Sequence, residues 1–182
     1  MRRAYAVLML LIGITLFYSC SNNTNTIKQK TIQSSLNKVD QQADGSIKLY
    51  VHKAECYSDK INPSSNTAEW NVFVSKSGRF NVWLSSATID TTNLEYDNKV
   101  MLSVQDNRLE AQPGIDKVIL NSSDVDLPYF RADSFMGSLY IQDTGHFAIQ
   151  IISEKILPEN STDDSGSEKT KLLSVFLTPV VR

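Results

Sequence analysis

The chain carries few side chains that could do acid–base or metal chemistry. It has two histidines, His52 and His146, and neither lies at metal-ligand spacing from another histidine or a cysteine. No Gly-x-Ser-x-Gly elbow is present to expose and activate a serine nucleophile. The acidic stretch 163–168 does not have the spacing of an EF-hand calcium loop, which indicates a solvated turn. We therefore expect no zinc site and no catalytic constellation.

Aromatic residues are the stronger candidates for ligand binding. Aromatic faces stack on the apolar surfaces of ligands such as sugar rings, while planar polar side chains bind hydroxyl groups. The stretch 129–133 places two rings, a cation and an anion together, and Tyr96 lies in a polar segment rich in hydrogen-bonding groups. The ligand-binding candidates are Tyr57, Tyr96, Tyr129, Phe130, Arg131 and Asp133.

Some of the aromatic and charged residues also have a purely structural interpretation. In 129–133, one ring could close the open end of a sandwich while Arg131 and Asp133 form an ion pair. Trp83 lies on the opposite strand face from Phe80, where either a partner from the other sheet or a concave binding face could cover it. Of these two, we expect Trp83 to belong to the core.

The candidates must be positioned by β-strands, because apolar and polar residues alternate with a period of two along most of the chain. We expect strands at 47–51, 70–74, 80–84, 100–104, 116–120, 137–142, 147–151 and 173–177. The turn at Ser77-Gly78 predicts a hairpin between the second and third of them. About eight short strands with polar turns indicate an all-β fold, a β-sandwich of jelly-roll type, over residues 46–182.

The N-terminus has the pattern of a lipoprotein signal peptide. Arg2 and Arg3 precede an apolar run over 4–18, which as a helix would be about 22 Å long. A membrane-spanning helix must cross a hydrocarbon core of roughly 30 Å. Ser19-Cys20 directly after the run is similar to the lipobox of bacterial lipoproteins, in which the cysteine is acylated. We expect a signal peptide over 1–19 that is removed, and palmitate-type acyl chains on Cys20 that act as a membrane anchor.

Residues 20–45 are polar and repetitive and have too few apolar side chains to bury a core, so we expect a flexible tether between the acylated Cys20 and the sandwich. The resemblance to lipoproteins of the Bacteroidetes type implies a lipid-anchored protein of the cell envelope of a Gram-negative bacterium, in its outer membrane. Ser21-Asn22-Asn23 lacks the acidic run that marks surface export in some of these lipoproteins, which favours the periplasmic leaflet.

The charge distribution argues against one class of partner. The formal net charge is −2, from 18 basic and 20 acidic residues that are scattered along the chain. A nucleic-acid-binding domain instead carries a strong basic excess gathered on one face. We therefore expect no nucleic-acid partner.

Two segments repeat one pattern and carry a resemblance to a known family. Residues 77–84 and 144–151 each place a glycine turn before an aromatic-led strand, Ala54-Glu55 and Glu69-Trp70 lie upstream, and 172–179 looks like the closing strand. Over 46–180 this arrangement resembles the galactose-binding-like β-sandwich, in particular carbohydrate-binding modules of families six and thirty-five. The resemblance implies a ligand site in the loops at one sandwich edge. It also implies a structural calcium ion at Glu55, although the last strand has no acidic residue to complete its cage.

Taken with the signal peptide, the resemblance implies a membrane-tethered, non-catalytic module that binds carbohydrate through loop aromatics. The alternative, from another class, is a structural or interaction lipoprotein that docks another cell-envelope protein. Exposed aromatics gathered in one cluster would favour a glycan, whereas a flat apolar patch of more than several hundred Å² would favour a protein partner. An enzyme would need a cleft with convergent titratable groups.

Overall fold

The computed structural model describes residues 37–156 and 169–180, and these form a β-sandwich of two sheets. The expected signal peptide over 1–19, Cys20 and the tether up to residue 36 lie outside the described residues. Within the described ranges there is no α-helix, only the short 3₁₀ turns η1 (Val51–Lys53) and η2 (Pro63–Ser65). No helix there is long and apolar enough to cross a membrane. The expected all-β sandwich is confirmed.

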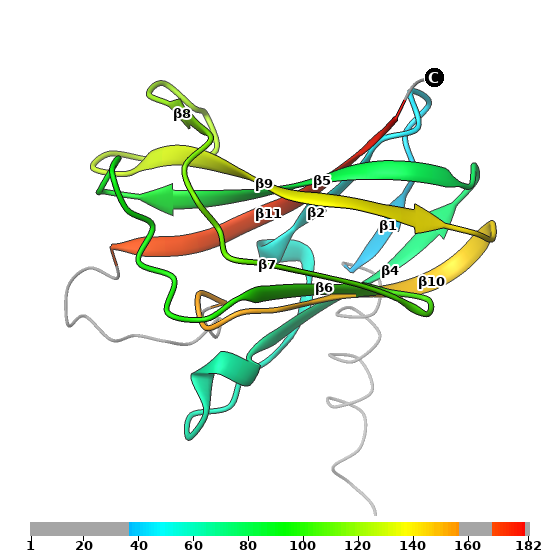
Figure 1. Cartoon of the computed structure of the whole chain (residues 1–182), viewed down its shortest axis with the longest axis horizontal. Helices are drawn as coiled ribbons and strands as arrows, with labels where there is room; N and C mark the ends of the chain where they lie inside the picture. Colours follow the sequence, from blue (N-terminus) through cyan, green and yellow to red (C-terminus); the bar gives the residue numbers. More distant parts are fainter. Residues whose placement is uncertain (1–36, 157–168, 181–182) are drawn as a thin grey trace, which may run out of the picture. The chain divides into compact units, whose positions relative to one another are not determined.

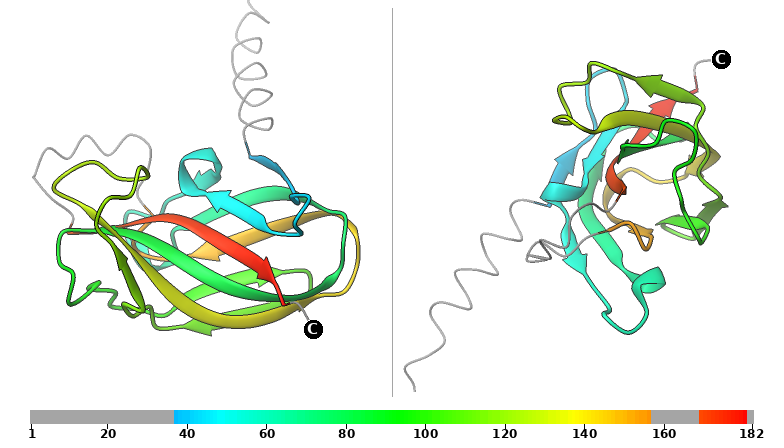
Figure 2. Two further views of the ribbon diagram at one scale, coloured as in Figure 1. Left: turned by 90° about the horizontal axis from the view of Figure 1, so that it is seen from above. Right: turned by 90° about the vertical axis from the view of Figure 1, so that its left-hand side faces the viewer.

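Each sheet is named here after its central strand. The β5 sheet has the order β2 (Ile47–Tyr50), β11 (Thr170–Pro179), β5 (Gly78–Thr88), β9 (Phe130–Ile141) and β8 (Lys117–Ile119). The β4 sheet has the order β1 (Lys38–Asp40), β4 (Thr67–Val74), β10 (Gly145–Ile152), β6 (Val100–Val104) and β7 (Asn107–Ala111), and β3 (Glu55–Tyr57) also pairs with β4. The β5 sheet lies above the β4 sheet in Figure 1, and the left view of Figure 2 looks down on it.

The core lies between the two sheets and is built by the predicted alternation. Trp70, Val72 and Val74 point inward from β4, and Phe80, Val82 and Leu84 point inward from β5; all six are at most 1% exposed. The indole Nε1–H of Trp70 donates to the carbonyl of Tyr50 at 2.9 Å, so its polar atom is satisfied although the ring is fully buried. One apolar face per strand is therefore what joins the sheets.

All eight predicted strands are present, and the structure adds β1, β3 and β7. β1 and β3 have three residues each, too few for alternation to show in the sequence. β7 is largely polar, and Leu109 is its main apolar contact with the core. Its position is set by pairing with β6, where Leu109 lies opposite Leu102.

The hairpin predicted at Ser77-Gly78 is wrong. β4 pairs along its whole length with β10, with Trp70 opposite Ile149, while β5 pairs with β11 and β9 in the other sheet. The connection therefore carries the chain from one sheet to the other. Both strands have an inward apolar face, which a hairpin and a sandwich crossing share, so alternation alone could not distinguish them.

The folded domain begins earlier than the expected boundary at residue 46. β1 pairs in parallel with β4, with Val39 opposite Val72, and Val39 packs against the core. Gln41 then fastens this end of the chain. Its Oε1 accepts the N–H groups of Ser75 at 2.9 Å and Lys76 at 2.7 Å, and its Nε2 donates to the carbonyl of Gly45 at 2.8 Å. Residues 38–40 are thus part of the sandwich and not of a tether.

β9 is longer than predicted, because it pairs with β5 along its whole length and a bulge inside it interrupts the alternation. The register with β5 shifts between Val82 and Trp83, where Gly137 has φ +122°. A Cβ at Gly137 would lie 3.1 Å from Leu109 Cδ1, so both the backbone conformation and the space favour glycine. The extra residue leaves both Phe135 and Ser138 on the outer face of the β5 sheet.

Candidate functional site

Aromatic side chains gather on the outer face of the β5 sheet, and we call this group the aromatic face. The strand register places Phe176 of β11 beside Trp83 of β5 and Trp83 beside Phe135 of β9, in one row across three strands. The ring centroids of Trp83 and Phe135 are 5.1 Å apart. Phe135 is 46% exposed. The aromatic face consists of Tyr50, Trp83, Phe135, Tyr140 and Phe176.

Alternation explains why these rings point outward. Trp83 lies between Val82 and Leu84, which are both completely buried, so its side chain must leave the opposite side of the strand. Phe176 lies between the buried Val175 and Leu177 in the same way. The expectation that Trp83 belongs to the core is therefore wrong, while its predicted position opposite Phe80 is confirmed.

Polar side chains extend the same surface toward the end of β5 at Gly78, and we call them the polar row. Asn81 and Ser138 lie opposite each other in the register of β5 and β9, and Ser138 Oγ donates to Asn81 Oδ1 at 2.7 Å. Thr178 of β11 lies on the other side of Asn81. This bond holds the planar amide in place next to the rings, and amides and hydroxyls can both donate to and accept from a sugar hydroxyl.

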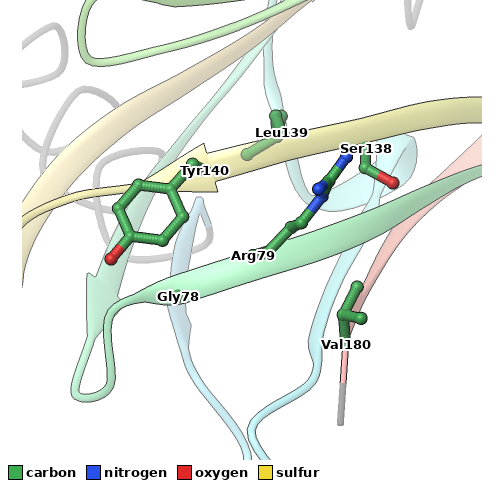
Figure 3. Close-up of a pocket in the computed structure, with 6 residues that line it drawn as sticks. All are labelled: Gly78, Arg79, Ser138, Leu139, Tyr140 and Val180. Carbon is green, nitrogen blue, oxygen red and sulfur yellow. The ribbon is translucent and has the colours of Figure 1, made fainter. Parts of the chain in front are cut away.

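Beyond the polar row lies an open hollow of about 720 Å³, lined by Gly78, Arg79, Ser138, Leu139, Tyr140 and Val180. Figure 3 shows the Arg79 side chain reaching across from β5 toward Ser138, with the Tyr140 ring on one side. Tyr140 is 52% exposed and its register partner across the sheet is Arg79. The hollow and the aromatic face are thus parts of one surface.

At the other end of the aromatic face, where β9 begins, Arg131 is held between two carboxylates. Its Nε and Nη2 donate to Asp133 Oδ1 at 2.8 Å and Oδ2 at 3.0 Å, and its Nη1 donates to Asp124 Oδ2 at 2.8 Å. Ser85 Oγ also donates to Asp133 Oδ1 at 2.7 Å. Partial burial lowers the pKa of the Arg131 guanidinium, but the bonds and charges of Asp133 and Asp124 outweigh it and raise that pKa. The ion pair considered for Arg131 and Asp133 is therefore present.

The structure places the other predicted ligand residues in different parts of the sandwich. Tyr129 and Phe130 are half-buried where β9 begins, so residues 129–133 belong to a strand and its entry and not to a long loop. The Tyr129 ring lies 5.0 Å from Lys171 Nζ, near the Arg131 end of the aromatic face. Tyr57 is 50% exposed, but it lies on β3 in the other sheet. The structure therefore brings only part of the predicted set together.

Tyr96 was expected as an exposed platform and is instead buried. It is 8% exposed, it belongs to the core, and its hydroxyl lies 2.9 Å from Ser86 Oγ, within hydrogen-bond distance. The loop that carries it is polar on its outer side only: Leu94 and Tyr96 turn inward, while Asn93 and Asp97 stay exposed. Its polar sequence neighbours therefore misled the prediction.

The burial of Tyr96 predicts alkaline sensitivity. Burial raises the pKa of the Tyr96 phenol above its ordinary value of 10.0, so the unfolded chain releases this proton at a lower pH than the folded protein. The free energy of unfolding should fall as the pH rises above about 10. In denaturant titrations between about pH 9 and 11, Tyr96→Phe should flatten this decline. Equal slopes for the wild type and Tyr96→Phe would contradict the assignment.

The calcium site implied at Glu55 does not fit the residues present. Glu55 lies opposite Glu69 in the register of β3 and β4, and Glu69 is already bonded to the amide of Gln150. In ranges 37–156 and 169–180 no group of three or more His, Cys, Asp or Glu side chains could hold a metal ion. Calcium takes six to eight oxygen ligands, which two carboxylates on one sheet face do not supply.

The sequence contains a pattern that indicates the aromatic face. In strands with alternating burial, Tyr50, Trp83, Tyr140 and Phe176 occupy the phase that is otherwise polar. Phe135 is the exception. The bulge at Gly137 shifts the alternation of β9, so counting back from the predicted strand 137–142 places Phe135 on the inner face. Aromatic residues at outward positions of several strands indicate a shared surface only once the strand order is known.

Comparison with known proteins gives the fold and little more. The chain matches no protein-family model and no curated protein sequence. It is similar to an α-L-fucosidase from Vibrio sp. strain EJY3, with a TM-score of 0.61 and 20% identity, over 79% of this chain and 24% of that one. A Podospora anserina β-(1,4)-mannanase described as GH26-CBM35 aligns with a TM-score of 0.46 and 11% identity, over 76% of this chain and 28% of that one. The chain thus spans about a quarter of these carbohydrate-active proteins.

Proposed function

We propose that this protein is a non-catalytic carbohydrate-binding module that holds its glycan on the aromatic face of the β5 sheet. The observation that supports the proposal is the row formed by Phe176, Trp83 and Phe135, three rings side by side across three strands. This replaces the loop site that the sequence suggested, because Tyr96 is buried. The glycan-binding surface is therefore a sheet face.

The proportions of the aromatic face suit an extended saccharide. From Arg79 to Ala87 along β5 the surface is about 26 Å long, at roughly 3.3 Å per residue. Rings lie in the middle, and the amide of Asn81 and the hydroxyl of Ser138 lie beside them. A sugar presents apolar C–H surfaces and hydroxyl edges, which these two kinds of side chain match. The expected ligand is an oligosaccharide longer than one ring.

The proposal of a non-catalytic role draws on the state of the carboxylates near the rings. Glycoside hydrolysis needs one carboxyl group as acid and a second as base or nucleophile. Asp124 and Asp133 on this surface are both bound to the Arg131 guanidinium, and Asp133 also accepts from Ser85. Carboxylates held in this way build the scaffold of the surface and are not poised for proton transfer.

Truncation of the central rings tests the proposed surface. We expect Trp83→Ala and Phe135→Ala to weaken binding of whichever polysaccharide the wild type binds on a broad panel, measured by isothermal titration on the full chain in detergent. Loss of a central aromatic at a binding surface costs about 2 kcal/mol, roughly a 30-fold loss of affinity. Both variants should keep their thermal midpoints close to that of the wild type, because the rings are partly exposed.

Exposed aromatics on the other sheet provide matched controls. Tyr57 and Phe73 are 50% and 38% exposed on the β4 sheet, and their replacement by alanine should leave binding unchanged. Wild-type protein that binds no polysaccharide would overturn the proposal. Binding that survives loss of Trp83 and Phe135 but not of Tyr57 would move the site to the other sheet.

We also propose that Cys20 carries acyl chains and tethers the module to a membrane of the cell envelope. The support is the juxtaposition of a basic start, an apolar run and Ser19-Cys20. In a Gram-negative host, Cys20→Ala should move the protein from the membrane pellet to the soluble fraction. A variant that still pellets after carbonate extraction would refute the anchor.

A further inference from the structure

We infer that the aromatic face takes an acidic polysaccharide, one that carries carboxylate or sulfate groups along its chain. This inference rests on the proposed function and specifies its substrate class. It starts from charge: although the whole chain has a net charge of −2, cations surround the aromatic face. The cationic side chains on or beside it are Lys48, Lys53, Arg79, Lys117, Arg131 and Lys171.

The register shows how these cations are spaced along the surface. Arg79 lies beside Tyr140, Lys48 lies beside Phe176 in the row of Trp83, and Lys171 lies beside Ala87 at the far end. Successive outward positions on one strand are about 7 Å apart. Positive charge therefore recurs along the full length of the surface, as a ligand with repeating negative charge requires.

The cations are held against the rings. Lys48 Nζ lies 5.9 Å from the Phe176 ring centroid, Arg131 Cζ lies 5.2 Å from the same ring, and Lys53 Nζ lies 5.6 Å from Tyr50. With Lys171 over Tyr129, all four cation–π contacts found in the described residues lie on this side of the molecule. An ammonium group over a ring still has N–H donors directed to solvent, so stacking and charge act at the same place.

The carboxylates near the surface offset part of this charge and leave an excess of cations. Asp124 and Asp133 are paired with Arg131, Asp116 accepts the backbone N–H of Phe135 at 2.6 Å and keeps its negative charge, and Asp44 interacts electrostatically with Lys48. The remaining cations, Lys48, Lys53, Arg79, Lys117 and Lys171, form no ion pair among the residues that the structure describes. The outer side of the β4 sheet differs in sign, because it presents Asp40, Glu55, Glu69 and Glu110 against Lys38 and Arg108.

A polyanion with sugar rings fits this combination better than other polyanions. Insertion into a bilayer needs a continuous protruding apolar surface. Phe135 is 46% exposed, but Trp83 and Phe176 are half-buried and the polar side chains of Asn81 and Ser138 lie beside the rings. Nucleic-acid sites carry a larger basic excess than six cations against four carboxylates. Both remain outcomes that the experiment can detect.

Pairs of polysaccharides that differ only in charge test the inference. The full chain in detergent is titrated with polygalacturonate and its methyl ester, and with dextran sulfate and dextran. We expect the charged member of at least one pair to bind roughly tenfold or more tightly, by analogy with charge-assisted recognition elsewhere. The pair that shows the difference identifies the group as carboxylate or sulfate.

The salt concentration and lysine variants test whether the preference for the charged polysaccharide comes from the cations of the aromatic face. The range of electrostatic interactions falls from about 10 Å in 0.1 M salt to about 3 Å in 1 M, so the preference for the charged member should largely disappear at the higher concentration. Lys48→Gln and Lys171→Gln should each reduce that preference several-fold. Lys99→Gln, an exposed lysine before β6, should not.

The outcomes separate the two proposals. Equal binding of charged and neutral members, insensitive to salt, would overturn the acidic substrate and leave carbohydrate binding intact. Binding of no polysaccharide would overturn both. Vesicles of phosphatidylglycerol or duplex DNA that bind as tightly as the acidic polysaccharide, and that depend on Lys48 and Lys171, would show that the surface recognises anionic polymers or lipid and not sugar.

Discussion

Replacing Trp70 by alanine is expected to lower the free energy of unfolding by about 3–5 kcal/mol, the usual cost of removing a large aromatic from a core. Trp70 is completely buried, and its Nε1–H is bonded to the Tyr50 carbonyl at 2.9 Å. Alanine would leave a cavity between the sheets and an unpaired carbonyl. The thermal midpoint should fall by roughly 6–20 °C for a domain of this size.

Trp83→Ala is the matched control, since the chain has just two tryptophans, and Trp70 points into the core whereas Trp83 points outward. Its thermal midpoint should change by a few degrees at most, while its affinity for the ligand should fall roughly 30-fold. Chemical denaturation followed by far-UV circular dichroism measures both variants. Equal destabilisation by the two substitutions would mean that Trp83 supports the core, which would contradict the account of the aromatic face.

Replacing Arg131 by methionine is expected to cost about 2 kcal/mol, near the value for hydrogen bonds to charged groups. Methionine keeps much of the apolar stem but removes the guanidinium that lies over Phe176, and it leaves Asp133, which is 9% exposed, with only the Ser85 hydroxyl as a side-chain partner. It also leaves the Asp124 carboxylate without its guanidinium partner. Urea denaturation of both proteins at neutral pH measures the difference.

Two further variants distinguish the loss of the Arg131–Asp133 ion pair from the loss of a positive charge alone. Lys117→Met removes an exposed cation that lies opposite Asp133 in the register of β8 and β9, and it should change stability by less than about 0.5 kcal/mol. The double variant Arg131→Met with Asp133→Asn should recover part of the lost stability, because the uncompensated buried charge is gone. A double variant as unstable as the sum of its parts would show that the two side chains are not coupled.

The strands could be predicted from the sequence because each has one apolar face. Phe80, Val82 and Leu84 mark β5 without any knowledge of its neighbours, and the sandwich follows from several such strands. Alternation does not show which strands pair with each other. The hairpin at Ser77-Gly78 failed for this reason, since β4 and β5 pair with strands far away in the chain.

The candidate site was harder to predict than the fold. Tyr96 has polar sequence neighbours, yet Leu94 and Tyr96 both turn inward and the tyrosine bonds to Ser86. Trp83 and Phe176 are 93 positions apart by their numbers, and become neighbours only through the pairing of β5 with β11. A surface assembled from one side chain per strand has no local sequence pattern. Arg131 and Asp133, two residues apart, are the part that was visible, and their ion pair was one of the two stated alternatives.

The two indole N–H signals in an ¹⁵N–¹H correlation spectrum test the central claim most directly. The Nε1–H of Trp83 lies in the proposed binding surface, whereas that of Trp70 is buried and bonded to Tyr50, and Trp83→Phe assigns the two signals. On titration with oligogalacturonate and with a neutral xylo-oligosaccharide, we predict that the Trp83 signal shifts in a saturable way with at least one of them while the Trp70 signal stays in place. Saturable binding that leaves Trp83 unmoved and shifts the backbone amides of residues 89–98 would contradict the account and return the site to the loops.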